Sequence, residues 1–156
     1  MKKCFIVILW FISMITCIFI GKHSYAKKVV TLQKRGDRFM SYYYLLTYWL
    51  KICQNGKSLK KYFEEKKYNN VIIYGYGPIG ERLLDELRRE DINVCLIVDS
   101  NLAEEDSRLG RIEDLEKQDA DVIVVTPTFA YEEIKSSIEN KVTCPIVSLD
   151  DVVYSV

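Results

Sequence analysis

Histidine and net charge are both scarce in this sequence. The single histidine, His23, lies outside the segment where we expect the folded domain, so that domain offers no residue for histidine acid–base catalysis or a histidine-containing zinc site. Lysine plus arginine number 22, and so do aspartate plus glutamate. No positive field therefore favours a nucleic acid as partner. Composition argues against nucleic-acid-binding proteins and against histidine-dependent enzymes.

A cysteine framework is lacking as well. The chain has five cysteines, and an odd count argues against a set of disulfides. Cys95 and Cys144 fall within predicted strands, where a free thiol behaves as a small buried apolar side chain. No cysteines have the spacing of a metal site. We therefore expect neither a disulfide scaffold nor a metal centre.

One stretch stands out, a glycine-spaced turn between an apolar strand and a helix. The strand is Val-Ile-Ile-Tyr at 71–74, and the spacing Gly75-x-Gly77-x-x-Gly80 follows it. The first glycine permits a tight turn, the second lets the backbone approach a pyrophosphate, and the third allows close helix–strand packing. An anion would bind at the helix N-terminus. The predicted nucleotide-binding residues of this turn are Gly75, Tyr76, Gly77, Pro78, Ile79 and Gly80.

Further site residues are expected at the carboxyl ends of two other strands: Asp99, Ser100, Thr126 and Thr128. Asp99 follows its strand about 20 residues after Gly80, where an acidic residue accepts hydrogen bonds from an adenosine ribose and disfavours a 2′-phosphate. The two threonines lie at the edge where open parallel sheets bind ligands. The alternative is a strand-turn-helix whose glycines serve only packing, with Asp99 capping a loop.

Apolar strands alternate with helices in the second half of the chain. Strands are predicted at 71–74, 94–98, 121–126 and 145–149, a short extended piece at 109–112, and helices after the glycine turn, at 113–117 and at 131–139. This alternation implies right-handed crossovers and a parallel sheet. The predicted fold class is α/β, a Rossmann-like half domain with a four-stranded parallel sheet of order 3-2-1-4, preceded by helices and an N-terminal apolar segment.

The first segment of the predicted organisation, residues 1–26, contains an apolar run at 4–20. As a membrane anchor, this run spans about 26 Å at about 1.5 Å per residue, and the lysines and arginines after it place the rest of the chain in the cytoplasm. As a signal peptide, it offers Ser24 and Ala26 before a cleavage point, and the domain is secreted. We favour the anchor. A misassigned start upstream of Met40 would leave the protein cytoplasmic.

The second segment, residues 27–68, is predicted to be a linker with two amphipathic helices, and the third, residues 69–156, the Rossmann-like domain. In the first helix one apolar stripe is formed by Phe39, Tyr43, Leu46, Leu50 and Cys53. We expect this stripe to pack on the domain or on a second copy of the chain, with a membrane interface as the alternative. Ser58 is the expected cap of the second helix.

Four segments carry a resemblance to a known family: Ile73 to Gly80, Ile97-Val98-Asp99-Ser100-Asn101, Gly110-Arg111-Ile112 and Asp121 to Val125. With them, residues 69 to about 151 resemble the N-terminal domain of PglD-type sugar acyltransferases and the C-terminal domain of sugar C-methyltransferases, which belong to bacterial surface-polysaccharide pathways. The resemblance implies a Rossmann-like fold and a nucleotide-sugar or dinucleotide such as NAD as ligand. It does not imply a reaction.

Three functions are left open. The leading hypothesis is a nucleotide- or nucleotide-sugar-binding module of surface-polysaccharide metabolism, non-catalytic alone. The second is an NAD-dependent oxidoreductase or epimerase completed by a partner, and the third a structural adaptor with an empty glycine turn. The expected partners are a nucleotide-type small molecule, the membrane through residues 4–20, and a second copy or a polysaccharide-pathway enzyme, but no nucleic acid. Two tyrosine–lysine pairs, Tyr62/Lys66 and Tyr131/Lys135, have the dehydrogenase spacing. Eleven tyrosines make such pairs expected by chance, so no catalytic residue is assigned.

Overall fold

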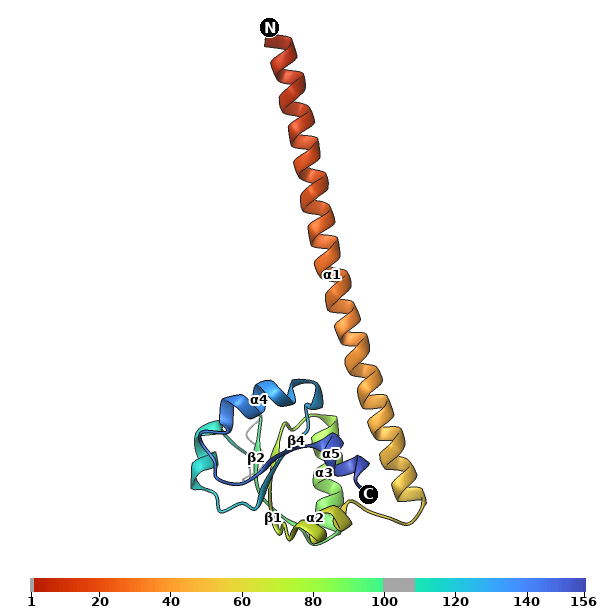
Figure 1. Cartoon of the computed structure of the whole chain (residues 1–156), viewed down its shortest axis with the longest axis vertical. Helices are drawn as coiled ribbons and strands as arrows, with labels where there is room; N and C mark the ends of the chain where they lie inside the picture. Colours follow the sequence, from red (N-terminus) through yellow and green to blue (C-terminus); the bar gives the residue numbers. More distant parts are fainter. Residues whose placement is uncertain (1, 100–108) are drawn as a thin grey trace. The chain divides into compact units, whose positions relative to one another are not determined.

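A computed structural model describes residues 2–99 and 109–156, with side chains for Lys22 and for the residues from 25 onward in those ranges. The chain divides into two units, Met1–Tyr43 and Tyr44–Val156. The first unit is a stretch of helix α1, which runs from Lys2 to Gln54. The second unit contains the C-terminal turns of α1 and the α/β domain (Figure 1).

Helix α1 (Lys2–Gln54) is one continuous helix where we expected a leader, a linker and a separate amphipathic helix. No proline interrupts this stretch, and Lys, Arg, Gln and Leu, which are good helix formers, dominate residues 27–38. Among the residues whose side chains are described, no helical stretch is long and apolar enough to span a membrane. The side chains of 4–20, on which the anchor prediction rests, lie outside the described residues, so the anchor stays a prediction.

The domain is built on a sheet of five parallel strands in the order β3-β2-β1-β4-β5. The strands are β1 (Asn70–Tyr74), β2 (Asn93–Val98), β3 (Leu109–Gly110), β4 (Val122–Val125) and β5 (Ile146–Ser148). Every residue of β4 is buried, as an apolar strand with neighbours on both edges requires. The parallel α/β architecture is confirmed.

Two details of the predicted sheet were wrong. There are five strands, because the extended piece expected near 109–112 pairs with β2 as an edge strand. The predicted third strand, which became β4, lies beside β1 and not beside β2. Local sequence reveals a buried strand, but the edge on which it is inserted depends on the path of the preceding connection.

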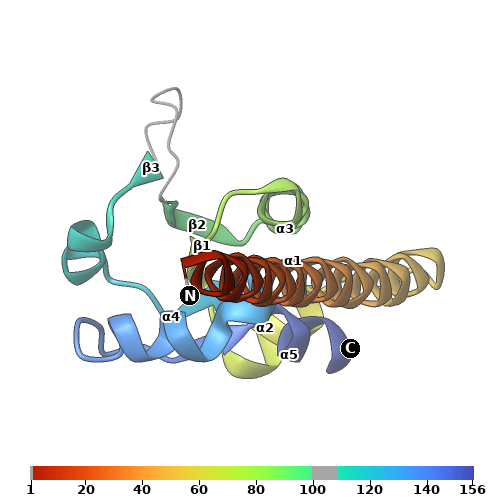
Figure 2. The same cartoon turned by 90° about the horizontal axis from the view of Figure 1, so that it is seen from above.

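The two main helices of the sheet lie on opposite faces. Figure 2 shows α3 (Pro78–Arg89) on one side of the strands and α4 (Tyr131–Ile138) on the other. On the α4 face, Ile138 shares a buried core with Leu115 of the short helix η1 (Ile112–Lys117) and with side chains of β1, β2 and β4. On the α3 face, Leu83, Leu84 and Leu87 are fully buried. This arrangement follows from right-handed crossovers that leave β1 and β4 in opposite directions.

The C-terminal turns of α1 pack on the domain by a face that we did not predict. Leu45, Trp49 and Ile52 are buried, whereas Leu46 and Leu50 of the predicted stripe are 40% and 57% exposed. Of the two placements expected for this stripe, packing on the domain was therefore wrong, and packing on a second copy stays a prediction.

Two short helices complete the α/β unit. Helix α2 (Lys60–Lys66) begins without a side-chain cap and its N-cap residue is Leu59, so the expected cap at Ser58 was also wrong. Helix α5 (Leu149–Tyr154) is capped by the side chain of Ser148, the residue before it.

Candidate functional site

The glycine turn joins β1 to α3, and its first glycine is required by the backbone. Gly75 has φ +98°, in the region that side chains other than glycine rarely adopt. A Cβ atom there would lie 2.7 Å from the hydroxyl oxygen of Thr126 and 2.7 Å from Cδ of Pro127. Its N–H donates to the carbonyl of Val98 at 2.7 Å. The turn is thus held against the ends of β2 and β4.

The third glycine is required by packing. A Cβ atom at Gly80 would overlap the carbonyl oxygen of Gly75, and Gly80 is buried in the first turn of α3. Only a residue without a side chain lets the helix begin this close to the strand. Gly75 and Gly80 therefore have the tight-turn and close-packing roles expected from the spacing.

For the second glycine, the described residues supply no such reason. Gly77 is the N-cap of α3, with φ −79° and ψ −174°, a conformation open to most residues. Among the described residues, no atom lies within 4 Å of a Cβ placed there. It makes no side-chain cap, and Pro78 follows at the first helical position. The uncapped N-terminus of a 12-residue helix therefore opens onto unfilled space at Gly77, where backbone N–H groups and the helix dipole favour an anion.

Asp99 is directed at the glycine turn from the end of β2. Its Oδ2 accepts a hydrogen bond from the backbone N–H of Tyr76 at 2.5 Å, so the half-buried carboxylate orders the turn as well as lying next to it. Burial, followed by the charge of Asp99, raises the pKa of the neighbouring Tyr74. This contact with the turn matches the alternative given for Asp99, the capping of a loop, and its contact with a ribose stays a prediction. Ser100, the next residue, lies outside the described part of the chain.

The two threonines after β4 have different places. Thr126 is 3% exposed, and its hydroxyl donates to the carbonyl oxygen of Gly75 at 2.8 Å, so it supports the turn from beneath. The backbone N–H of Thr128 donates to the carbonyl of Thr126 at 2.9 Å, and the Thr128 side chain lines a hollow. Thr126 is better described as a residue that positions the turn, and Thr128 as one that can contact a ligand.

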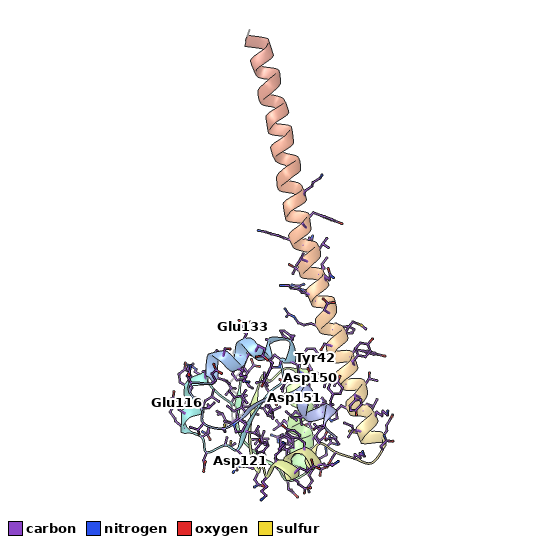
Figure 3. All side chains as sticks on the ribbon, viewed as in Figure 1. Tyr42, Glu116, Asp121, Glu133, Asp150 and Asp151 are labelled. Carbon is purple, nitrogen blue, oxygen red and sulfur yellow. The ribbon has the colours of Figure 1, made fainter. Side chains whose placement is uncertain are left out.

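The hollow lies at the carboxyl ends of β4 and β5 and has a volume of about 600 Å³. It is lined by Thr128, Phe129, Ala130, Tyr131, Glu132, Glu133, Ser148, Asp150 and Asp151. Figure 3 labels three of its carboxylates, Glu133 of α4 and Asp150 and Asp151 of α5. Four carboxylates and two aromatic rings surround a single space, an arrangement that accepts hydrogen bonds from hydroxyl groups and disfavours a phosphate.

Asp150 is a partly buried carboxylate of the hollow. Burial raises the pKa of this carboxyl, the charge of Asp151 raises it further, and a hydrogen bond from Thr128 opposes the shift. Asp151 has a structural task, because its Oδ2 accepts weakly from the Ser148 N–H at 3.4 Å and completes the cap of α5. The hydroxyl of Tyr131 donates to the carbonyl of Ile146 at 2.9 Å. Tyr131 is thus tied to the sheet by its hydroxyl.

Sequence reasoning missed most of this hollow. It assigned Thr128 but not Phe129, Glu133 or Asp150, because no motif connects residues from two strand ends. The signal available was the acidic pair Asp150-Asp151 directly after a buried strand, which resembles the position of Asp99 after β2. In the part of the chain that was searched, no cluster of three or more His, Cys, Asp or Glu side chains is arranged to hold a metal ion.

Comparison with known proteins adds one match. Residues 67–145, just over half of the chain, match the model of a family described as C2185-like, N-terminal. The matched stretch contains the glycine turn, Asp99, Thr126 and Thr128. No curated protein and no solved structure matches the chain.

Proposed function

This chain belongs to the family described as C2185-like, N-terminal, and we propose that its α/β domain binds a nucleotide-type ligand, with a nucleotide-sugar as the first candidate. The family description names no ligand, so the support comes from geometry. One observation carries the proposal. Neither the backbone of Gly77 nor its packing against the described residues requires a glycine, whereas a phosphate at the N-terminus of α3 would.

The position of the turn in the sheet supports the same proposal. The chain leaves β1 toward β2 and later returns to place β4 on the other side of β1. In open parallel sheets, ligands bind beyond the carboxyl ends of the strands where the direction of the connections reverses. The carboxyl ends of β1 and β4 are Tyr74 and Val125, and both lie directly before the residues of the site.

The acid-lined hollow favours a sugar as the second half of the ligand. It begins at Thr128, two residues beyond the hydroxyl that contacts the glycine turn. Carboxylates such as that of Asp150 accept hydrogen bonds from sugar hydroxyls, and exposed rings such as Phe129, 49% exposed, can stack on a sugar face. A role as a non-catalytic binding module in surface-polysaccharide metabolism is consistent with such a ligand.

NAD is a second candidate because of Asp99. A carboxylate at the end of β2 is where the ribose hydroxyls of an adenosine are bound in dinucleotide-binding folds. The same carboxylate disfavours NADP, whose 2′-phosphate would meet a negative charge. Under this candidate the chain would be an oxidoreductase- or epimerase-like protein whose active site a partner completes.

Titration calorimetry of the full chain in detergent micelles tests the proposal with NAD, NADP and a panel of uridine- and guanosine-diphosphate sugars. We expect heat with one ligand class, and its loss in Gly77→Val, whose side chain would occupy the phosphate space. Gly36→Ala is the matched control, because a Cβ there also meets no described atom within 4 Å and the site is elsewhere. Absence of heat with every ligand would overturn the proposal and leave the structural adaptor.

A further inference from the structure

Helix α1 carries a long apolar stripe with the spacing of a coiled coil. Steps of four and three residues alternate without a break along Tyr25, Val29, Leu32, Gly36, Phe39, Tyr43, Leu46, Leu50 and Cys53. This is the a/d pattern of a heptad repeat over four heptads. The repeat extends toward the N-terminus beyond the stripe predicted at 39–53, because residues 27–38 are also helical.

The members of this heptad stripe are exposed in both units. In the first unit Tyr25, Val29, Leu32 and Phe39 are 72%, 42%, 57% and 70% exposed. In the second unit Leu46, Leu50 and Cys53 are exposed as well. A regular row of large apolar side chains left in water is unfavourable. Exposed to this extent among the described residues, the stripe is a candidate surface for a partner.

Within the second unit, the domain does not block this stripe. Leu45, Trp49 and Ile52, which pack on the domain, share one side of the helix. At 100° per residue, Leu46, Leu50 and Cys53 are centred roughly 100° away on its surface. One side of the C-terminal turns of α1 thus holds the α/β domain, and another is open to a second helix.

We propose that the heptad stripe binds a second copy of this chain as a parallel, two-stranded coiled coil. A helix with the same 4-3 spacing is the natural occupant, because each a or d side chain inserts between four side chains of a facing heptad helix. The charges permit this pairing. Lys28 and Arg35 at g positions face Gln33 and Met40 at the e positions of the other copy, so no like charges meet across the seam.

A lipid surface is a poorer occupant. Tyrosines such as Tyr25 and Tyr43 also occur at the headgroups of a membrane, but a helix that lies on lipid does not need an unbroken alternation of four- and three-residue steps. Among the side chains of α1 that the structure describes, Trp49 is the one tryptophan, and it is 5% exposed and packs on the domain. The polar residues Lys27, Lys34 and Ser41 occupy the f positions opposite the seam, as in coiled coils in water.

A matched pair of neighbouring valines tests the proposal. Val29 is a stripe residue, and Val30, 52% exposed, lies at a b position outside it. Analytical ultracentrifugation of the full chain in density-matched detergent should give twice the mass of one chain for the wild type. Val29→Glu should raise the dissociation constant at least about 10-fold, since a charge enters an apolar layer, while Val30→Glu leaves it unchanged. A monomeric wild type, a mass above two chains, or equal effects of the two variants would overturn the proposal.

A variant expected to strengthen the dimer and a chemical cross-link between the two copies complete the test. Gly36 leaves one a position without a side chain, so Gly36→Leu should lower the dissociation constant. In a parallel dimer Cys53 meets Cys53 of the second copy, and a short bismaleimide should yield a Cys53–Cys53 peptide by mass spectrometry that Cys53→Ser lacks. Weaker association of Gly36→Leu, or Cys53 joined only to other cysteines, contradicts the parallel arrangement.

Discussion

Gly77 and Gly80 are three residues apart, yet their surroundings predict losses of stability of different size for the same substitution. A methyl group at Gly80 overlaps the carbonyl of Gly75, a backbone atom that cannot move away cheaply, whereas one at Gly77 meets no described atom within 4 Å. We expect Gly80→Ala to lower the free energy of unfolding by about 2–4 kcal/mol and Gly77→Ala by less than about 1 kcal/mol. Urea denaturation of both variants checks this, and equal losses would contradict the packing role of Gly80.

Asp150 has a testable pH dependence. Its pKa is raised in the folded state by burial, so its ionisation costs stability as the pH rises through the folded pKa. Below the unfolded pKa the carboxyl is protonated in both states and the cost vanishes. We therefore expect Asp150→Asn to be more stable than the wild type at pH 7, with the difference disappearing toward pH 3. Thermal unfolding across this range provides the measurement.

Asp114 supplies a control for that experiment, because its replacement by asparagine should change stability in the opposite direction. A hydrogen bond from Lys117, at 2.7 Å, lowers the pKa of this exposed carboxyl. Folding therefore favours the ionised form of Asp114. Its contribution to the stability of the folded state is present above the unfolded pKa and is lost as the pH falls through the folded pKa. Asp114→Asn should be less stable than the wild type at pH 7. If both asparagine variants shift in the same direction, the assignment of the Asp150 effect to burial is wrong.

Between elements, the key contact is a buried carboxylate that joins α1 to α3. Glu86 of α3 is 7% exposed and accepts hydrogen bonds from the indole N–H of Trp49 and from the backbone N–H of Leu59 at 2.7 Å. Two donors on one acceptor-only group satisfy a charge that would otherwise be costly to bury. The contact attaches the end of α1 and the start of α2 to the helix that begins at the glycine turn.

Removing the charge from this contact should weaken it. In Glu86→Gln the amide offers a single oxygen acceptor and directs its NH₂ group at one of the two donors, so a buried donor is left unsatisfied. We expect the free energy of unfolding to fall by about 1–3 kcal/mol. Glu90→Gln, at the end of the same helix, is the matched control, because Glu90 makes only a 3.9 Å ion pair with the partly exposed Lys60. Urea denaturation followed by fluorescence separates the two, and equal effects would contradict the structural role of Glu86.

For the whole molecule, we propose that the N-terminal segment holds the chain in the membrane with the α/β domain in the cytoplasm. The positive charges that follow residues 4–20 favour this orientation. Mass spectrometry of the protein from membranes should find an intact N-terminus at Met1, and protease should digest the domain only after the cells are opened. A chain that begins at Lys27 in the secreted fraction would contradict the anchor and would place the domain away from cytoplasmic nucleotides.

The sequence by itself determined the elements whose causes are local. Gly75, Pro78 and Gly80 predicted a turn and a helix start because dihedral angles and steric limits act within a few residues. The apolar runs at β1, β2 and β4 predicted buried parallel strands, since burial on both faces imposes a continuous apolar run. Asp99 could be assigned to the turn because its strand and spacing are part of one βαβ unit.

The tertiary structure alone decided what depends on segments distant in the chain. The place of β4 beside β1, the support of Gly75 by Thr126, and the hollow around Asp150 all arise where separate strand ends meet. It also decided that Trp49 and Ile52, and not Leu46 and Leu50, pack on the domain. An amphipathic pattern shows that a helix has an apolar side, but this helix has two, and only three-dimensional contact selects which of them faces its own domain.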